Sequence, residues 1–138
     1  MIYWSSVPFP ENGSNTNIKN AVIALALNAI FKPTYCVVKN ANGTKTYKPS
    51  IALAKELFLS KYDPEKIQEG LQPVMVYVGR NVLNATQFGV LFDGAKFFSE
   101  SFLRIFDLAF KYYSVLNIEY PAENCRVWKF VKDKIYQI

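Results

Sequence analysis

The sequence predicts an α+β fold, in which an antiparallel sheet from two hairpins packs against helices, two of them C-terminal. Two dipeptides predict the hairpins: Asn42-Gly43 and Asp93-Gly94 each lie between β-rich runs, and these residue types tolerate the positive φ of a two-residue turn. Apolar residues at helical spacing predict the penultimate helix. With 138 residues, 51% of them hydrophobic, the chain is expected to form a single domain, residues 1–138.

The first part of the chain is predicted to hold a helix followed by the first hairpin. Thr16 or Asn17 is expected to cap a buried helix that runs to about Phe31. Its apolar run is too short to span a bilayer, so we expect no membrane segment. Segments 35–39 and 44–48 should then pair as the strands of the hairpin.

Two short helices are expected between the hairpins. Ser50 should cap one that runs to about Leu59. The tripeptide Asp63-Pro64-Glu65 predicts the start of another, which ends at Gly70. Both predictions depend on residue types that are favoured at helix ends.

Three strands are predicted in the middle of the chain. Segment 73–79 is rich in valine, and segments 87–92 and 95–98 flank the second turn dipeptide, Asp93-Gly94. Because each connection is short, we expect the three strands to form an antiparallel meander.

The C-terminal part is predicted to form two helices joined near Pro121. Ser99 or Ser101 should cap the first, whose apolar face consists of Phe102, Ile105, Phe106, Ala109, Phe110, Tyr113 and Leu116. The second should run to Ile138, with a stripe made of Val127, Val131, Ile135 and Ile138 and with Trp128 beside it.

The sequence lacks the residues that most catalytic and metal-binding sites require. The chain has no histidine, which excludes Ser-His and Cys-His pairs and histidine metal sites. Its two cysteines, Cys36 and Cys125, are too few for a four-thiolate zinc site, and no glycine-rich phosphate loop occurs. We therefore expect no enzyme activity, no catalytic residue and no cofactor. Without a secretory signal pattern, we expect an intracellular protein, cytoplasmic or nuclear, with free thiols.

The second half of the chain carries one resemblance to a known group. Within residues 74–138, the segments "FGVLFDGAKFF", "VLNIEYP" and "VWKF" resemble the C-terminal region of animal proteins similar to sterile-alpha-motif-domain-containing protein 3, and of transposon-associated sequences. The resemblance implies a terminal module of a longer intracellular protein. It includes no catalytic signature, so it transfers no functional residue.

The aromatic content favours an interaction or self-association module. Tyr and Phe supply 20 residues and two tryptophans add to them, so we expect some rings to remain exposed on a domain of this size. Exposed rings favour protein interfaces, and the hairpins offer free strand edges. The expected partner is a second copy of the chain, as a homodimer, or another protein.

Nucleic-acid binding is the alternative. The net charge is +5, and basic and aromatic residues occur together in the C-terminal region. The candidate contacts with nucleic acid or a partner are Lys111, Tyr112, Arg126, Lys129 and Lys132. A solvated helix face explains the lysines equally simply, and the basic residues are spread along the chain, so self-association is the favoured hypothesis.

Overall fold

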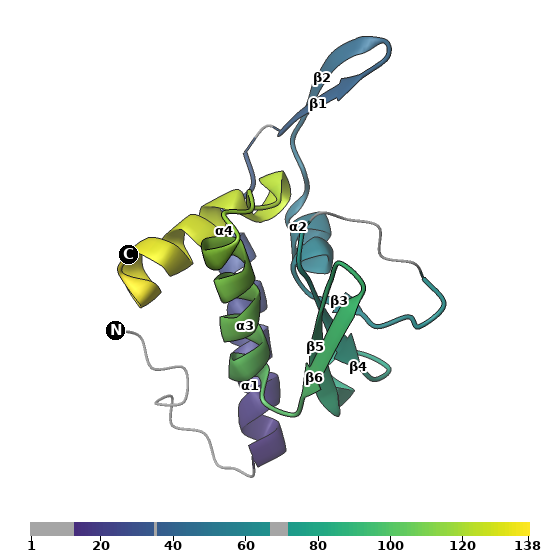
Figure 1. Cartoon of the computed structure of the whole chain (residues 1–138), viewed down its shortest axis with the longest axis vertical. Helices are drawn as coiled ribbons and strands as arrows, with labels where there is room; N and C mark the ends of the chain where they lie inside the picture. Colours follow the sequence, from purple (N-terminus) through teal and green to yellow (C-terminus); the bar gives the residue numbers. More distant parts are fainter. Residues whose placement is uncertain (1–12, 35, 67–71) are drawn as a thin grey trace.

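Helices cover one side of a four-stranded sheet, and a separate two-stranded hairpin projects beyond one end of the helices (Figure 1). The computed structural model describes residues 13–34, 36–66 and 72–138. The elements in chain order are α1 Gly13–Ile30, β1 Cys36–Asn40, β2 Gly43–Tyr47, α2 Ile51–Phe58, β3 Ser60–Lys61, β4 Val74–Val78, the 3-10 turn η2 Val82–Asn84, β5 Gln87–Phe92, β6 Ala95–Ser99, α3 Phe102–Val115, the 3-10 turn η3 Ala122–Asn124, α4 Cys125–Phe130 and the π-helical turn η4 Val131–Tyr136. The predicted α+β class is confirmed.

The two hairpins belong to separate sheets rather than to one. β1 and β2 form a two-stranded sheet of their own, whereas β5 and β6 lie in a sheet of order β3-β4-β5-β6. The predicted meander of β4, β5 and β6 is confirmed. β3, which pairs in parallel with β4, was not predicted, because two residues are too few to show a strand period.

The structure contains both predicted hairpins, but only the Asp93-Gly94 turn lies at the predicted position. Asp93 and Gly94 have φ values of 49° and 81°, as the central residues of a type I′ turn require. In the first hairpin Asn40 pairs with Gly43, so the turn lies one residue earlier than predicted. Gly43 opens β2 with a φ of 114°, which only glycine adopts without strain.

The predicted start of α1 is wrong, and its predicted end is confirmed. The helix begins at Gly13, so Thr16 and Asn17 lie inside it and do not cap it. Several residues suited to an N-cap follow one another here, so residue type alone leaves the boundary open. The Asn17 side-chain oxygen instead accepts a hydrogen bond from the Phe102 amide, 3.2 Å away, at the start of α3.

The caps of α2 and α3 are confirmed. The Ser50 and Ser101 hydroxyl oxygens accept hydrogen bonds from the third amide of their helices. The helix predicted from Asp63 is not present as far as residue 66: the Asp63 carboxylate accepts a hydrogen bond from the Glu65 amide and closes a turn. Its remaining predicted residues, 67–70, lie outside the described part of the chain.

The core is built largely of aromatic rings. The predicted apolar face of α3 is buried except for Leu116, which is 52% exposed. Leu116 faces outward because the chain leaves the helix there through Asn117, whose φ is 53°. On the buried side, Trp128 of α4 packs against Phe106 and Tyr113 of α3, with ring centroids 5.4 and 5.0 Å apart.

The last helix packs on α3 along most of the predicted stripe. Val127 and Val131 are fully buried, whereas Ile138 is exposed. Beyond α4, the Tyr136 ring stacks on Phe110 with centroids 4.0 Å apart, and its hydroxyl donates a hydrogen bond to Asp107. No helix within the described residues has the length and apolar character that crossing a membrane would need.

A buried asparagine pair joins three segments that are distant in the sequence. The Asn124 side-chain amide nitrogen donates to Asn28 Oδ1 of α1, at 2.9 Å, and to the Ala54 carbonyl oxygen of α2, at 2.8 Å. Both asparagines are 1% exposed. Because α1 precedes the β1–β2 hairpin and α2 follows it, this amide ties both flanks of the hairpin to the start of α4.

We expect Phe106→Ala to lower the free energy of unfolding by about 3–5 kcal/mol, because it removes a ring that is 2% exposed from the centre of the aromatic core. Thermal unfolding of the variant measures the loss. Val115→Ala, on the same helix but 78% exposed, is the matched control and should change stability by less than about 0.5 kcal/mol. Equal midpoints for the two variants would contradict the packing of α3.

Asn124→Ala should destabilise the domain because it leaves the buried Asn28 Oδ1 without its donor and removes a second hydrogen bond to the Ala54 carbonyl. The orphaned acceptor costs about 1–3 kcal/mol, so the unfolding midpoint should fall clearly in chemical denaturation. Asn84→Ala, at an exposed position, serves as the control and should unfold like the wild type. If both variants unfold like the wild type, the amide does not join the three segments.

Candidate nucleic-acid interface

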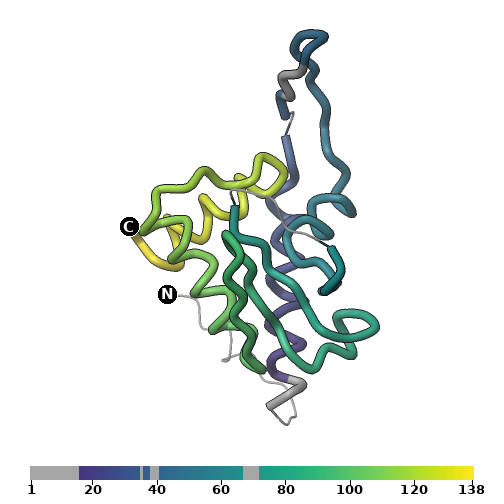
Figure 2. The backbone as a smooth tube through the Cα atoms, turned by 45° about the vertical axis from the view of Figure 1, so that its right-hand side comes forward, coloured from purple at the N-terminus to yellow at the C-terminus, as the bar shows by residue number. Residues whose placement is uncertain are grey.

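The β1–β2 hairpin, which we call the arm (residues 36–47), stands away from the rest of the domain (Figure 1). Figure 2 shows the same projection from a view turned by 45°. The strand β2 is exposed from Gly43 to Thr46. Pro33 and Pro49, both buried, lie on either side of the arm and restrict the backbone where it leaves the body.

The arm lies in a stretch of the chain that has no acidic side chain. Between Glu11 and Glu56 the sequence contains six lysines and neither aspartate nor glutamate, so this stretch alone exceeds the net charge of +5 of the whole chain. Lys32, Lys45 and Lys48 are exposed at the base of the arm and along β2. Two of the six lysines, Lys39 and Lys45, lie on the arm itself and Lys32 and Lys48 flank it, whereas the other two belong to α1 and α2.

The outward face of the last helix is also basic. Arg126, Lys129 and Lys132 are exposed and spaced three residues apart, which places them along one side of the helix. The opposite side holds the buried Val127, Trp128 and Val131. These three cations are among the predicted contact residues, and the structure brings them together.

The basic helix face and the arm meet at the base of the arm. The Arg126 guanidinium donates a hydrogen bond to the Lys32 carbonyl oxygen, with a nitrogen–oxygen distance of 3.1 Å. The Tyr47 hydroxyl donates to the Glu123 carboxylate just before α4. That hydrogen bond raises the pKa of Tyr47 to about 12.

Together these cations form one surface, which we call the arm–helix surface. It consists of Lys32, Lys45, Lys48, Arg126, Lys129 and Lys132. In Figure 1, α4 starts beneath the arm and runs away from it, so the two basic parts diverge from a shared corner. One nearby carboxylate, Glu123, is engaged by Tyr47, and another, Asp133, is exposed on the turn after α4.

Two of the predicted contact residues lie elsewhere. Lys111 projects from α3 and forms an ion pair with Asp107, at 2.7 Å. Tyr112 is half-buried and packs its ring on Phe92 of β5, with centroids 5.0 Å apart. Lys111 and Tyr112 are adjacent in sequence but point to different sides of α3, because consecutive helical residues are about 100° apart.

The lysines of the arm were missed from the sequence for an identifiable reason. The basic residues are spread along the chain, so clustering does not single out the arm. The informative signal is the absence of carboxylates around them, from residue 12 to residue 55. Combined with the hairpin prediction, that absence places an unopposed positive charge on the arm.

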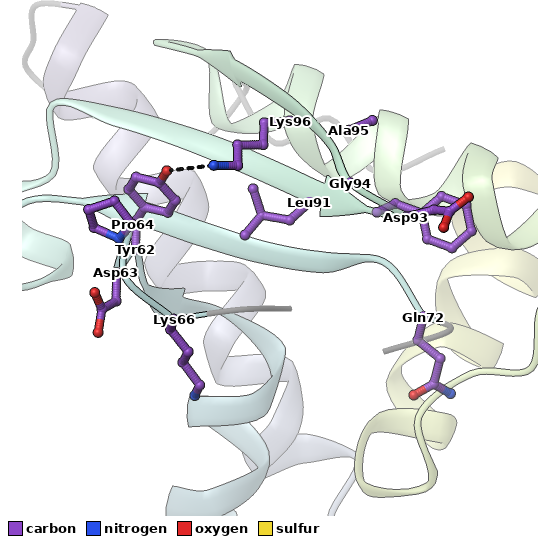
Figure 3. A pocket seen from close by; sticks show the side chains of 11 residues that line it. Tyr62, Asp63, Pro64, Lys66, Gln72, Leu91, Asp93, Gly94, Ala95 and Lys96 are labelled. Atoms are coloured by element: carbon purple, nitrogen blue, oxygen red, sulfur yellow. Dashed lines mark hydrogen bonds between the residues drawn. The ribbon is translucent and has the colours of Figure 1, made fainter. Parts of the chain in front are cut away.

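A pocket of about 260 Å³ lies on the side of the sheet away from the helices (Figure 3). Its charged lining is balanced, with Asp63 and Asp93 against Lys66 and Lys96. The Lys96 ammonium donates to the Tyr62 hydroxyl across 3.4 Å. These charged groups are solvent-exposed, so the pocket selects neither an anion nor a cation. Within the described residues, no group of three or more His, Cys, Asp or Glu side chains is suited to a metal ion.

Comparison with known proteins adds no template for this surface. No family model, curated protein or solved structure matches the chain. The resemblance of residues 74–138 to sterile-alpha-motif-domain-containing protein 3-like and transposon-associated proteins therefore stays a prediction. The arm–helix surface has to be interpreted from its own geometry and charge.

Proposed function

We propose that this domain binds nucleic acid through the arm–helix surface. The observation that carries the proposal is the acid-free arm, which adjoins a helix face with three further cations. Lysine and arginine side chains bind nucleic acid by neutralising phosphates and releasing condensed counterions. A projecting element can follow a polyanion more closely than a flat surface, because it exposes cations on more than one side.

A simpler explanation covers part of the pattern. Exposed strand edges often carry lysine, which prevents edge-to-edge aggregation. That explanation accounts for Lys45 on β2. It does not account for Arg126, Lys129 and Lys132, which lie on a helix and have no strand edge to protect. Polyanion binding accounts for both groups of cations with one cause.

The aromatic residues give less support to a protein interface than their number suggests. Among the large apolar residues exposed in the described part of the chain, Phe97 is the one aromatic residue. The other rings of the described core pack on one another, for example Phe58 on Trp128, with centroids 5.3 Å apart. Within the described part of the chain, most rings thus stabilise the fold and are not available to a partner.

We expect a fluorescein-labelled oligonucleotide to bind the domain with an affinity that falls steeply between about 50 and about 200 mM salt. The double variant Lys45→Ala/Lys48→Ala should lower the affinity and reduce the slope of log K against log salt by about 2, since two phosphate contacts are lost. Fluorescence anisotropy measures both quantities.

The matched control is Lys61→Ala/Lys66→Ala, which removes the same charge from exposed positions away from the arm. It should leave the slope unchanged. Equal losses in the two double variants would show that net charge alone acts, and would overturn the proposed surface. Binding to anionic phospholipid vesicles without any binding to oligonucleotides would overturn the function.

Self-association is the second candidate, and the arm supplies a specific observation for it. β1 and β2 form a two-stranded sheet, so within the described residues each strand has one edge without a strand neighbour. A second copy of the chain could add its arm edge to edge, as a homodimer.

The two candidates respond to salt in opposite directions. Pairing two lysine-bearing arms brings like charges together, so salt should strengthen a homodimer by screening their repulsion. Light scattering coupled to gel filtration, at micromolar concentration and at low and high salt, should detect the dimer and its increase with salt. A monomer under both conditions would exclude self-association as the function of the arm.

A further inference from the structure

We infer that the arm–helix surface takes double-stranded DNA, with the arm in the major groove and α4 against the flanking phosphates. This inference rests on the proposed function and specifies its substrate class. Three features of the surface carry it: the state of its aromatic rings, the dimensions of the arm, and the position of the helix cations relative to the arm.

The rings near the surface are not free to stack on unpaired bases. Proteins that bind single strands present exposed aromatic side chains to successive bases. Here Phe31 and Phe130 stack on each other, with centroids 4.6 Å apart. Tyr47 is half-buried, and its hydroxyl is held by Glu123. Among the described residues, the surface therefore offers cations without a stacking platform, which favours a duplex over a single strand.

The arm has the dimensions of a groove-binding ribbon. Each strand has five residues, so the ladder is about 17 Å long, and the two strands lie about 4.8 Å apart. The major groove of B-DNA, about 12 Å wide, admits a two-stranded ribbon, whereas the minor groove, about 6 Å wide, has to be widened to take one. The major groove of duplex RNA is deep and narrow, so it excludes such a ribbon.

The side chains of β2 suit the edges of base pairs. Thr44 and Thr46 are exposed on one face of the ribbon and Lys45 is exposed on the other, because successive strand residues alternate. Threonine hydroxyls donate hydrogen bonds to base edges in the major groove, and Lys45 on the opposite face is left to contact phosphates. At the tip, the turn residues Ala41 and Asn42 and the following Gly43 are exposed.

The helix cations are placed for the sugar–phosphate backbone. Arg126 is anchored at the base of the arm through the Lys32 carbonyl, and Lys129 and Lys132 follow along the same exposed side of the helix. With the arm in the groove, this side of the helix lies where the backbone borders the groove. The three cations then contact phosphates and fix the register, whereas the threonines of the arm contact the bases.

The test compares four labelled oligonucleotides of one sequence at one salt concentration: duplex DNA, each of its two single strands, and duplex RNA. We expect duplex DNA to bind at least about tenfold more tightly than the others, because it alone combines a duplex with a wide major groove. Methyl green, which occupies the major groove, should compete with the protein, and netropsin, which occupies the minor groove, should not.

Two variants separate the roles within the surface. Thr44→Ala/Thr46→Ala should weaken duplex binding while leaving the salt slope unchanged, since it removes base-edge contacts and no charge. Lys129→Ala/Lys132→Ala should reduce the slope. Circular dichroism melting confirms that each variant is folded before it is compared.

The outcomes distinguish this inference from the proposed function. Single strands or duplex RNA that bind as tightly as duplex DNA would overturn the groove assignment and leave nucleic-acid binding in place. Competition by netropsin instead of methyl green would also overturn it. If the protein binds none of the four oligonucleotides at low salt, both the inference and the proposed function fail.

Discussion

The Asn124 amide holds together the parts of the molecule that the arm–helix surface needs. It donates to Asn28 of α1 and to the Ala54 carbonyl of α2, so the segments before and after the arm are fixed to the start of α4. Asn28 Oδ1 is buried, and a buried acceptor without a donor is costly, so separating these segments lowers stability. Together with the Arg126–Lys32 and Tyr47–Glu123 hydrogen bonds, the Asn124 amide thus sets the angle between the arm and the basic helix face.

The sequence predicted the elements whose signals are local. The Ser50 and Ser101 caps and the Asp93-Gly94 turn depend on residues within four positions of one another, and the structure contains all three. The short strand β3 depends on parallel pairing with Val76, a contact between distant positions that leaves no pattern in two residues. Leu116 continues the helical spacing but faces solvent, because the backbone departs from the helix beside it.

The candidate site was predictable only in part, for a related reason. Spacing along one helix predicts that Arg126, Lys129 and Lys132 share a face, and they do. That Lys45 belongs with them follows from the way the base of the arm meets α4, which no sequence pattern encodes. Aromatic content was a poor guide, because residue type does not show whether a ring such as Trp128 packs inside or remains outside.

The arm itself argues for a use outside the domain. An isolated two-stranded hairpin is marginally stable in water, and this one adds exposed residues rather than core contacts along β2. Its lysines also repel one another, since residues 12–55 contain no carboxylate that could offset their positive charge. The buried Pro33 and Pro49 and the Tyr47–Glu123 hydrogen bond nevertheless anchor its base. A bound polyanion would relieve the repulsion, and by linkage whatever binds the folded arm stabilises it. The same lysines that destabilise the isolated arm by repelling one another would therefore attract a phosphate backbone.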